Sequence, residues 1–201
     1  VTDARQLGIA VAPPGINRSM LDFTIEDFEK GRKGEREKGR RGDRKSNSAP
    51  LHHRSPASHS LIRYGLAAIK NAGEGAVQVI IDERETNGSF KDPVDLADRV
   101  DLRRVGKRAL ESMARVGVFD EWGSRARILD ALDRMVGHSG SAHAAAEAGQ
   151  MTLFGGNGGS ARIDVALLRA EKDVKPIDRR ELLDWEKELI GVYLTEHPLE
   201  H

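Results

Sequence analysis

The chain has 201 residues, of which 38% are hydrophobic and 32% charged, so one core filling its whole length is not expected. It contains no Cys, which excludes disulfides and thiolate zinc sites and is compatible with the reducing cytoplasm, where we expect the protein to work. No apolar run approaches the roughly 20 residues of a membrane span, and we expect no signal peptide at the charged N-terminus. Basic and acidic residues number 32 each, so the formal net charge is zero. A zero sum does not exclude nucleic-acid binding, because a phosphate group responds to the local charge around it.

The N-terminal part of the chain predicts a small β-hairpin interrupted by a long insertion. Pro13-Pro14-Gly15 is a turn signal, and residues 21–25 alternate as a strand does. Residues 29–60 contain almost nothing apolar and carry ten Lys or Arg against four Asp or Glu, which favours disorder. We expect a solvated insertion between two strands in preference to a dedicated DNA-binding tail. Residues 61–64 then predict the strand that pairs with residues 23–25.

Residues 61–136 are expected to be the ordered centre, and they contain an internal repeat. The segment that begins at Ile69 recurs 33 residues later at Leu102, with the apolar positions, the Gly and the small Ala in register. Each copy predicts a short helix, a tight turn that suits positive φ and a second helix with one apolar face. Between the copies, Asn87-Gly88 is expected to end one helix and Asp92-Pro93 to begin the next.

Two such copies predict a tandem helix-hairpin-helix domain in a mostly α chain. The turn of each unit presents backbone N–H groups at a helix N-terminus, where a phosphate oxygen can bind without any base being read. A purely structural helical bundle is the alternative. The candidate DNA-binding residues are the small turn residues and the neighbouring polar or cationic ones, namely Lys70, Asn71, Gly73, Gly75, Arg104, Gly106, Lys107 and Arg108.

Beyond the repeat, residues 125–136 predict an amphipathic helix, after which order is expected to lapse in a flexible linker over residues 137–178. A further amphipathic helix is expected to begin at Arg179 and to end near Gly191. Within the linker, Leu153 and Phe154 are large apolar residues among Gly, Ala and Ser, and burying each in a partner's pocket would contribute roughly 1.5–3 kcal/mol. Gln150 offers hydrogen bonds at the rim of such a pocket. A stray apolar patch that folds back on the domain is the alternative.

Catalytic and metal-ligating patterns do not stand out in this sequence. Two-metal nucleotidyl transfer needs converging carboxylates, and no Asp-x-Asp occurs. The acidic pair Asp184 and Glu186 is expected on an exposed helix face, and the seven His residues are scattered. We therefore predict no catalytic residue, no metal site and no cofactor in this stretch.

A set of short segments, spread over nearly the whole chain outside residues 29–60 and the spacers, carries a resemblance to a known family. They are residues 13–17, 22–24, 62–66, 68–71, 73–76, 99–102, 107–111, 117–120 and 186–195. Together they resemble the alpha subunits of bacterial DNA polymerase III, the C-family replicative polymerases. That family's first hairpin turn resembles Gly-Val-Gly, whereas this chain has Asn71-Ala72-Gly73.

The resemblance implies a domain order along the chain. It is an end-of-fingers region at residues 1–28, a disordered basic insertion at 29–60, a tandem helix-hairpin-helix domain at 61–136, a flexible linker with a clamp-binding motif at 137–178, and a helix leading toward an oligonucleotide-binding barrel at 179–201. In this reading Gln150, Leu153 and Phe154 bind the sliding clamp, the beta subunit.

The resemblance also implies a parent enzyme, a DNA-directed DNA polymerase that uses Mg²⁺ and whose active site lies upstream of Val1. This piece itself is then expected to be non-catalytic and to hold duplex DNA. The expected partners are double-stranded DNA, the sliding clamp and other replicase subunits, with no membrane. Two alternatives remain: a helix-hairpin-helix module of a DNA repair enzyme, and a protein-interaction scaffold whose hairpins only pack.

Overall fold

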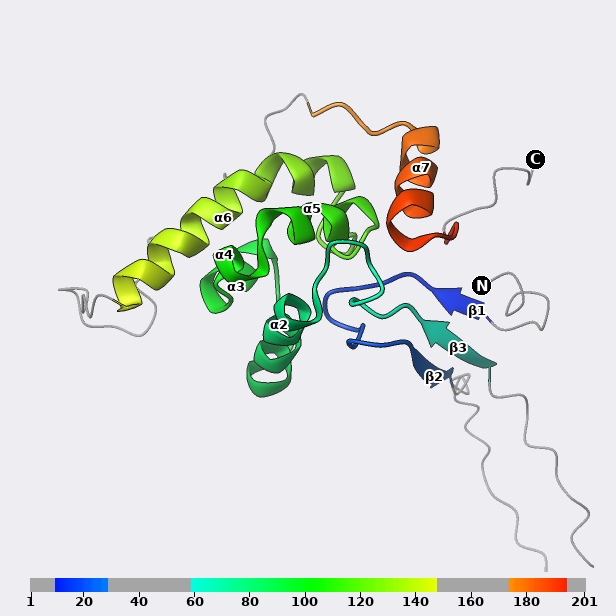
Figure 1. Ribbon diagram of the computed structural model, residues 1–201, viewed down its shortest axis with the longest axis horizontal. Helices are drawn as coiled ribbons and strands as arrows, with labels where there is room; N and C mark the ends of the chain where they lie inside the picture. The colour runs from blue at the N-terminus through cyan, green and yellow to red at the C-terminus, as the bar shows by residue number, and fades with distance from the viewer. Residues whose placement is uncertain (1–9, 29–58, 148–173, 195–201) are drawn as a thin grey trace, which may run out of the picture.

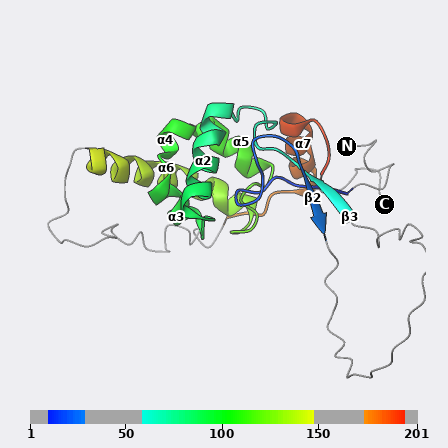
Figure 2. The same cartoon turned by 90° about the horizontal axis from the view of Figure 1, so that it is seen from below.

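A computed structural model describes residues 10–28, 59–147 and 174–194, which form a small sheet beside a group of helices (Figure 1). The mostly α architecture predicted from the sequence is confirmed. The strands are β1 (Ala10–Ala12), β2 (Thr24–Phe28) and β3 (His59–Arg63). The helices are α2 (Glu74–Asn87), α3 (Pro93–Arg99), α4 (Leu102–Val105), α5 (Lys107–Arg115), α6 (Arg125–Glu147) and α7 (Arg179–Ile190). Figure 2 shows the sheet at one end of the helical group.

The sheet has the order β1-β3-β2. β2 and β3 are antiparallel, with Ile25 opposite Ile62, which confirms the pairing predicted across the long insertion. β1 adds a third strand, parallel to β3, that the sequence did not predict because three residues are too few to show an alternation. Buried Arg63 fixes the arrangement, since its guanidinium pairs with the Glu26 carboxylate and donates to the carbonyl oxygen of Pro13 at 3.1 Å. The hydrogen bond from Arg63 lowers the pKa of Glu26.

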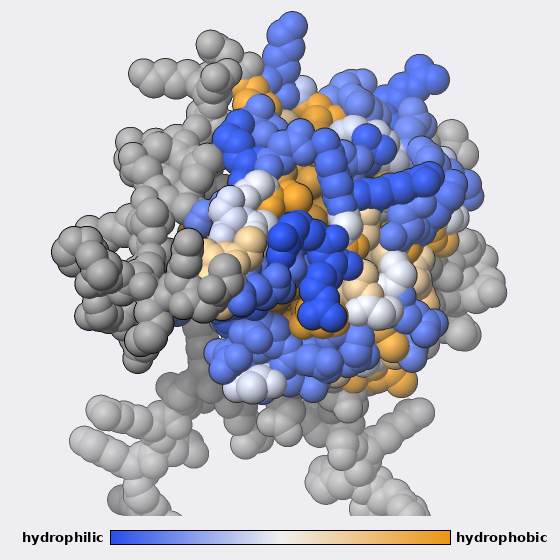
Figure 3. All heavy atoms as spheres, turned by 60° about the vertical axis from the view of Figure 1, so that its left-hand side comes forward, coloured by the Kyte–Doolittle hydropathy of each residue, from blue (hydrophilic) through white to orange (hydrophobic). Residues whose placement is uncertain are grey.

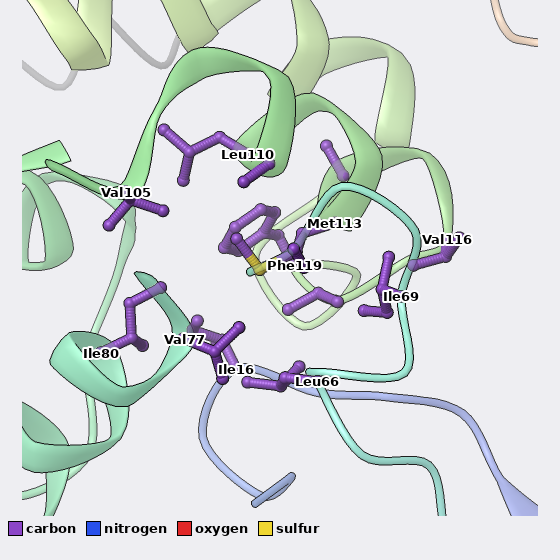
Figure 4. Packing of buried hydrophobic residues seen from close by; sticks show 14 of the residues in the cluster. Ile16, Leu66, Ile69, Val77, Ile80, Val105, Leu110, Met113, Val116 and Phe119 are labelled. Carbon is purple, nitrogen blue, oxygen red and sulfur yellow. The ribbon is translucent and has the colours of Figure 1, made fainter. Parts of the chain in front are cut away.

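The core lies where the helices meet the loops that lead out of the sheet. Figure 4 shows side chains from α2 and α5 pointing toward those of the loops around Ile16 and Leu66. Phe119 and Met113 fill its centre and are almost completely buried. Arg84 of α2 reaches into this region as well, and its buried guanidinium donates to the carbonyl oxygens of Ile16 and Ser19 at 2.8 and 2.9 Å. The loop that precedes β2 is therefore held against α2 by hydrogen bonds as well as by packing.

Helix ends follow the predicted signals at two places. α2 ends at Asn87, and Gly88 after it has φ 83°. α3 begins at Pro93, where the Asp92 side chain accepts hydrogen bonds from the N–H groups of Val94 and Asp95, both at 2.8 Å. Such an N-cap satisfies donors that have no carbonyl partner inside the helix.

α6 is longer than the sequence indicated. The prediction that order lapses after Gly137 is wrong for residues 137–147, which continue the helix to Glu147. The reason is a set of tertiary contacts made by Ser139, which is fully buried. Its hydroxyl donates to the carbonyl oxygen of Val100 at 2.8 Å and accepts from the N–H of Leu102 at 2.9 Å. A small polar residue that would favour a loop in isolation thus fastens α6 to the junction of α3 and α4. The predictions for residues 29–58 and 148–173 concern segments outside the described residues.

Removing the Ser139 hydroxyl tests this docking. Ser139→Ala should lower the free energy of unfolding by about 1–3 kcal/mol, because it leaves the Leu102 N–H and the Val100 carbonyl buried without their partner. Denaturant titration measures the change. The matched control is Ser141→Ala, since that exposed hydroxyl bonds only within α6, to the carbonyl oxygen of Gly137, and its loss should cost within about 0.5 kcal/mol. Equal losses for the two variants would show that Ser139 does not fasten the helix.

The last helix agrees with prediction at both ends but not on one of its faces. α7 runs from Arg179 to Ile190, and Gly191 after it is left-handed with φ 75°. Glu186, however, is only 1% exposed, so the prediction that it is a solvated helix charge is wrong. Its carboxylate accepts from the N–H of Leu194 at 2.8 Å and lies 3.5 Å from the Arg125 guanidinium. Arg125 comes from the start of α6, a partner that local sequence does not reveal.

Candidate nucleic-acid interface

The second predicted hairpin has the expected form. α4 ends at Val105 and α5 begins at Lys107, with Gly106 between them at φ 87° and ψ 136°. The N–H of Gly106 donates to the carbonyl oxygen of Leu102 at 3.0 Å, which closes α4. A side chain at this φ would be strained, so the turn depends on glycine. A Cβ at Gly106 would meet nothing within 4 Å, so the main chain of the turn faces open space.

The N-terminus of α5 combines free main-chain donors with positive charge. The first N–H groups of a helix have no carbonyl partner within it, and the helix dipole adds partial positive charge there. Lys107 and Arg108 occupy this first turn, both are exposed, and no acidic residue shares the turn. Arg104 is exposed on α4 just before the turn. Backbone donors with cations on both sides suit a phosphate oxygen.

These three cations differ in their ion pairs. The Lys107 ammonium lies 2.6 Å from a carboxylate oxygen of Asp133 on α6, and the hydrogen bond that it donates to Asp133 raises the pKa of Lys107. In the part of the chain that the structure describes, neither Arg104 nor Arg108 lies within ion-pair distance of a carboxylate. Sequence reasoning missed Asp133, because it is far from Lys107 along the chain and no spacing rule connects them.

The first hairpin differs from the second. The short helix expected before its turn is absent: residues 66–72 form successive turns, in which Ile69 N–H donates to the Leu66 carbonyl at 3.2 Å and Ala72 N–H to the Ile69 carbonyl at 3.0 Å. Positive φ occurs at Asn71, at 69°, whereas Gly73 has φ −66°. The left-handed residue thus precedes α2 by three positions, while Gly106 directly precedes α5.

Several polar groups of the first hairpin form hydrogen bonds or ion pairs with other parts of the fold. The Lys70 N–H donates to the carbonyl oxygen of Leu189 at 2.9 Å, and its ammonium lies 3.9 Å from Glu188, both on α7. The Asn71 side chain donates to the Ser112 hydroxyl of α5 at 3.0 Å. These contacts hold the first turn against both α5 and α7. They also leave fewer of its polar groups for a ligand than the second turn has.

The open part of the first hairpin is the start of α2. Gly73 and Gly75 are exposed, and a Cβ at either would meet nothing within 4 Å, so the main chain there is accessible. Glu74 stands between them, however, and its negative charge opposes an anion at this helix end. The first helical turns of α2 and α5 therefore have opposite charge, negative at α2 and positive at α5.

The structure places the two hairpins in contact with each other. The bond from Asn71 to Ser112 joins the first turn to the helix that begins at the second, and α2 contacts α4. Figure 3 turns the left-hand side of Figure 1 toward the reader. The described part of this face is largely hydrophilic, with apolar side chains in small areas between polar ones. The predicted clamp-binding residues Gln150, Leu153 and Phe154 lie outside the described residues.

Neither a cluster of metal ligands nor a membrane-spanning helix occurs among the described residues. Over residues 10–28, 59–147 and 174–194, no three or more His, Asp or Glu side chains gather where they could hold a metal ion. Among the helices within those same ranges, none is long and apolar enough to cross a membrane.

Comparison with known proteins gives two kinds of match. A family model described as a helix-hairpin-helix motif matches residues 8–129. DNA polymerase III subunit alpha of Caulobacter vibrioides is 34% identical over 199 residues, covering 98% of this chain and 14% of that protein. The subunit of the same name from Thermus aquaticus is 32% identical, covering 99% and 13%, and that from Deinococcus radiodurans is 31% identical, covering 100% and 12%. The chain thus spans about one seventh of the length of these relatives.

Proposed function

Because the chain belongs to the helix-hairpin-helix family, we propose that it holds double-stranded DNA, without reading base sequence, as part of a bacterial replicative DNA polymerase. One observation carries the proposal. At the second hairpin, a glycine turn that opens to solvent leads into a helix whose first turn has two exposed cations and no acidic residue. A phosphate oxygen is the ligand that this arrangement fits best.

The proposed contacts explain why binding would be independent of sequence. A phosphate oxygen at the start of α5 accepts from main-chain N–H groups, while Arg104 and Arg108 add charge-assisted bonds from either side. Phosphates are the same at every base pair, so such contacts give affinity and register without discrimination among bases. Lys107 contributes once its ammonium leaves Asp133.

The two hairpins would contribute unequally. We assign the larger share of affinity to the second hairpin, because its cations surround an open main chain. The first hairpin would contribute through the exposed main chain of Gly73 and Gly75, with Glu74 reducing its share. Its further role is structural, since Asn71 holds α5 in place through Ser112.

The similarity to DNA polymerase III subunit alpha supports a larger setting for this piece. We propose that the parent protein is a DNA-directed DNA polymerase working in the cytoplasm with other replicase subunits. Nucleotidyl transfer and its Mg²⁺ ions would belong to other parts of that enzyme, and this piece would hold the duplex that leaves the active site. The relatives named above are all polymerase subunits, which favours this reading over the repair-module and scaffold alternatives.

Tethering to the sliding clamp is the second part of the proposal. The peptide from Gln150 to Phe154 follows α6, whose last residue is Glu147, by two residues. Leu153 and Phe154 would enter an apolar pocket of the clamp, and Gln150 would form hydrogen bonds at its rim. A clamp that encircles the same DNA would then be linked to the hairpin domain through one short peptide.

Amide chemical-shift mapping with short duplexes of unrelated sequence tests the DNA-binding part. We expect the largest changes at Gly106, Lys107 and Arg108, smaller ones at Gly73 and Gly75, and the same pattern for each duplex. A pattern that changes with base sequence would contradict sequence-independent binding. No change at any salt concentration would favour a scaffold whose hairpins only pack.

A further inference from the structure

Of the three cations around the start of α5, namely Arg104, Lys107 and Arg108, only Lys107 has an ion-pair partner among the described residues. Its ammonium lies 2.6 Å from Asp133 of α6 and 3.8 Å from Glu111 of its own helix. The Lys107 side chain is 53% exposed and that of Asp133 is 72% exposed, so the pair stands at the surface beside the start of α5. A phosphate bound to that helix end would meet the same ammonium.

We propose that Asp133 competes with DNA phosphate for Lys107 and so weakens duplex binding by this domain. The inference rests on the proposed function and assigns a regulator to its site. A carboxylate and a phosphate both present anionic oxygens to the ammonium, and the carboxylate repels a phosphate that approaches its partner. Asp133 is mostly exposed, so its carboxylate loses little when it returns to water, and the exchange is readily reversible.

Other ion pairs in the region do not have this property. Arg103 pairs with Asp101, but Asp101 also caps α4 by accepting from the Arg103 N–H at 3.1 Å, so that carboxylate has a structural task. Glu111 lies one turn beyond Lys107 on the same helix, farther from the ammonium than Asp133. Asp133 has no hydrogen bond to the main chain among the described residues that would fix it in place.

Asp133→Asn in the 201-residue chain tests the inference, with duplex affinity as the readout. Because an exposed ion pair contributes little, the variant should bind about 1.4- to fivefold more tightly at low salt. The matched control is Asp130→Asn, which removes the same charge from the same helix but breaks a pair with Arg134 instead. It should change affinity by less than Asp133→Asn does.

A second background separates competition from general charge. With Lys107→Ala already present, Asp133→Asn should give no more than the gain of the Asp130 control, because the contested ammonium is gone. A full gain in that background would overturn the inference. So would weaker binding by Asp133→Asn alone, which would mean that Asp133 positions Lys107 for phosphate. If the unmodified chain fails to bind duplex at all, the proposed function fails instead, so the two failures are distinct.

Discussion

Replacing Leu153 and Phe154 with Ala is expected to abolish binding of the sliding clamp while duplex affinity and helix content stay unchanged. Each side chain would bury apolar surface worth roughly 1.5–3 kcal/mol, so the pair supplies about 3–6 kcal/mol. The isolated peptide has few other anchors, so it should bind the clamp weakly, with a dissociation constant on the order of micromolar. Loss of both anchors would then leave a dissociation constant of about 0.1 mM or weaker.

Titration of the clamp against the unmodified chain and the double variant measures this effect. Thr152→Ala is the matched control, because it changes the same peptide without removing an apolar anchor and should bind nearly as tightly as the unmodified chain. Equal clamp binding by the double variant and the unmodified chain would end the assignment of this peptide as the clamp site.

Tethering would be strong only when the hairpins bind the DNA and the peptide binds the clamp on that same DNA. Once the hairpins hold the duplex that the clamp encircles, binding of the peptide becomes intramolecular, with an effective concentration in the millimolar range for a short flexible link. A micromolar peptide contact is then nearly saturated. The double variant should therefore lose the mutual enhancement of DNA and clamp binding as well as the clamp contact itself.

Elements with a local signal could be predicted from the sequence. α7 shows a clear helical period, and Gly191 marks its end because a left-handed residue there is easiest for glycine. Gly88 after α2 and Asp92 with Pro93 at the start of α3 are similarly local signals. The pairing of β2 with β3 was predictable because an alternating segment, residues 21–25, precedes the insertion and a second strand-like segment, residues 61–64, follows it.

Features that depend on tertiary partners could not be predicted. Gly137 and Ser139 indicate a helix break when only neighbours are considered, yet Ser139 finds partners at Val100 and Leu102 and the helix continues. Judged by its sequence neighbours, Glu186 resembles a surface charge, but in the fold its carboxylate pairs with Arg125 of another helix. In each case the energy that decides the structure comes from a contact between residues distant in the sequence.

The candidate site follows the same division. Gly106, Lys107 and Arg108 form one turn, so the repeat and its glycine were enough to locate them. The inequality of the two hairpins was not visible, because the roles of Asn71 and Lys70 depend on Ser112 and Leu189 of other helices. Asp133 likewise became evident only from the packing of α6 beside α5.

Duplex binding through the second hairpin is tested most directly by replacing Lys107 and Arg108 with Ala. Both side chains are exposed and Ala favours helix, so the fold should persist. Dissociation constants are measured over a range of salt for two duplexes of unrelated sequence. The matched control replaces Lys91 and Lys175, two exposed cations outside both hairpins, and removes the same charge.

The double variant at the hairpin should bind both duplexes about 10- to 100-fold more weakly at low salt, because two charge-assisted contacts are lost. Its plot of log affinity against log salt should be shallower by about 1.8, the slope for two phosphate contacts. The control should retain nearly all of the affinity and slope. Loss confined to one sequence, or an unchanged salt slope in the hairpin variant, would contradict sequence-independent phosphate binding at this turn.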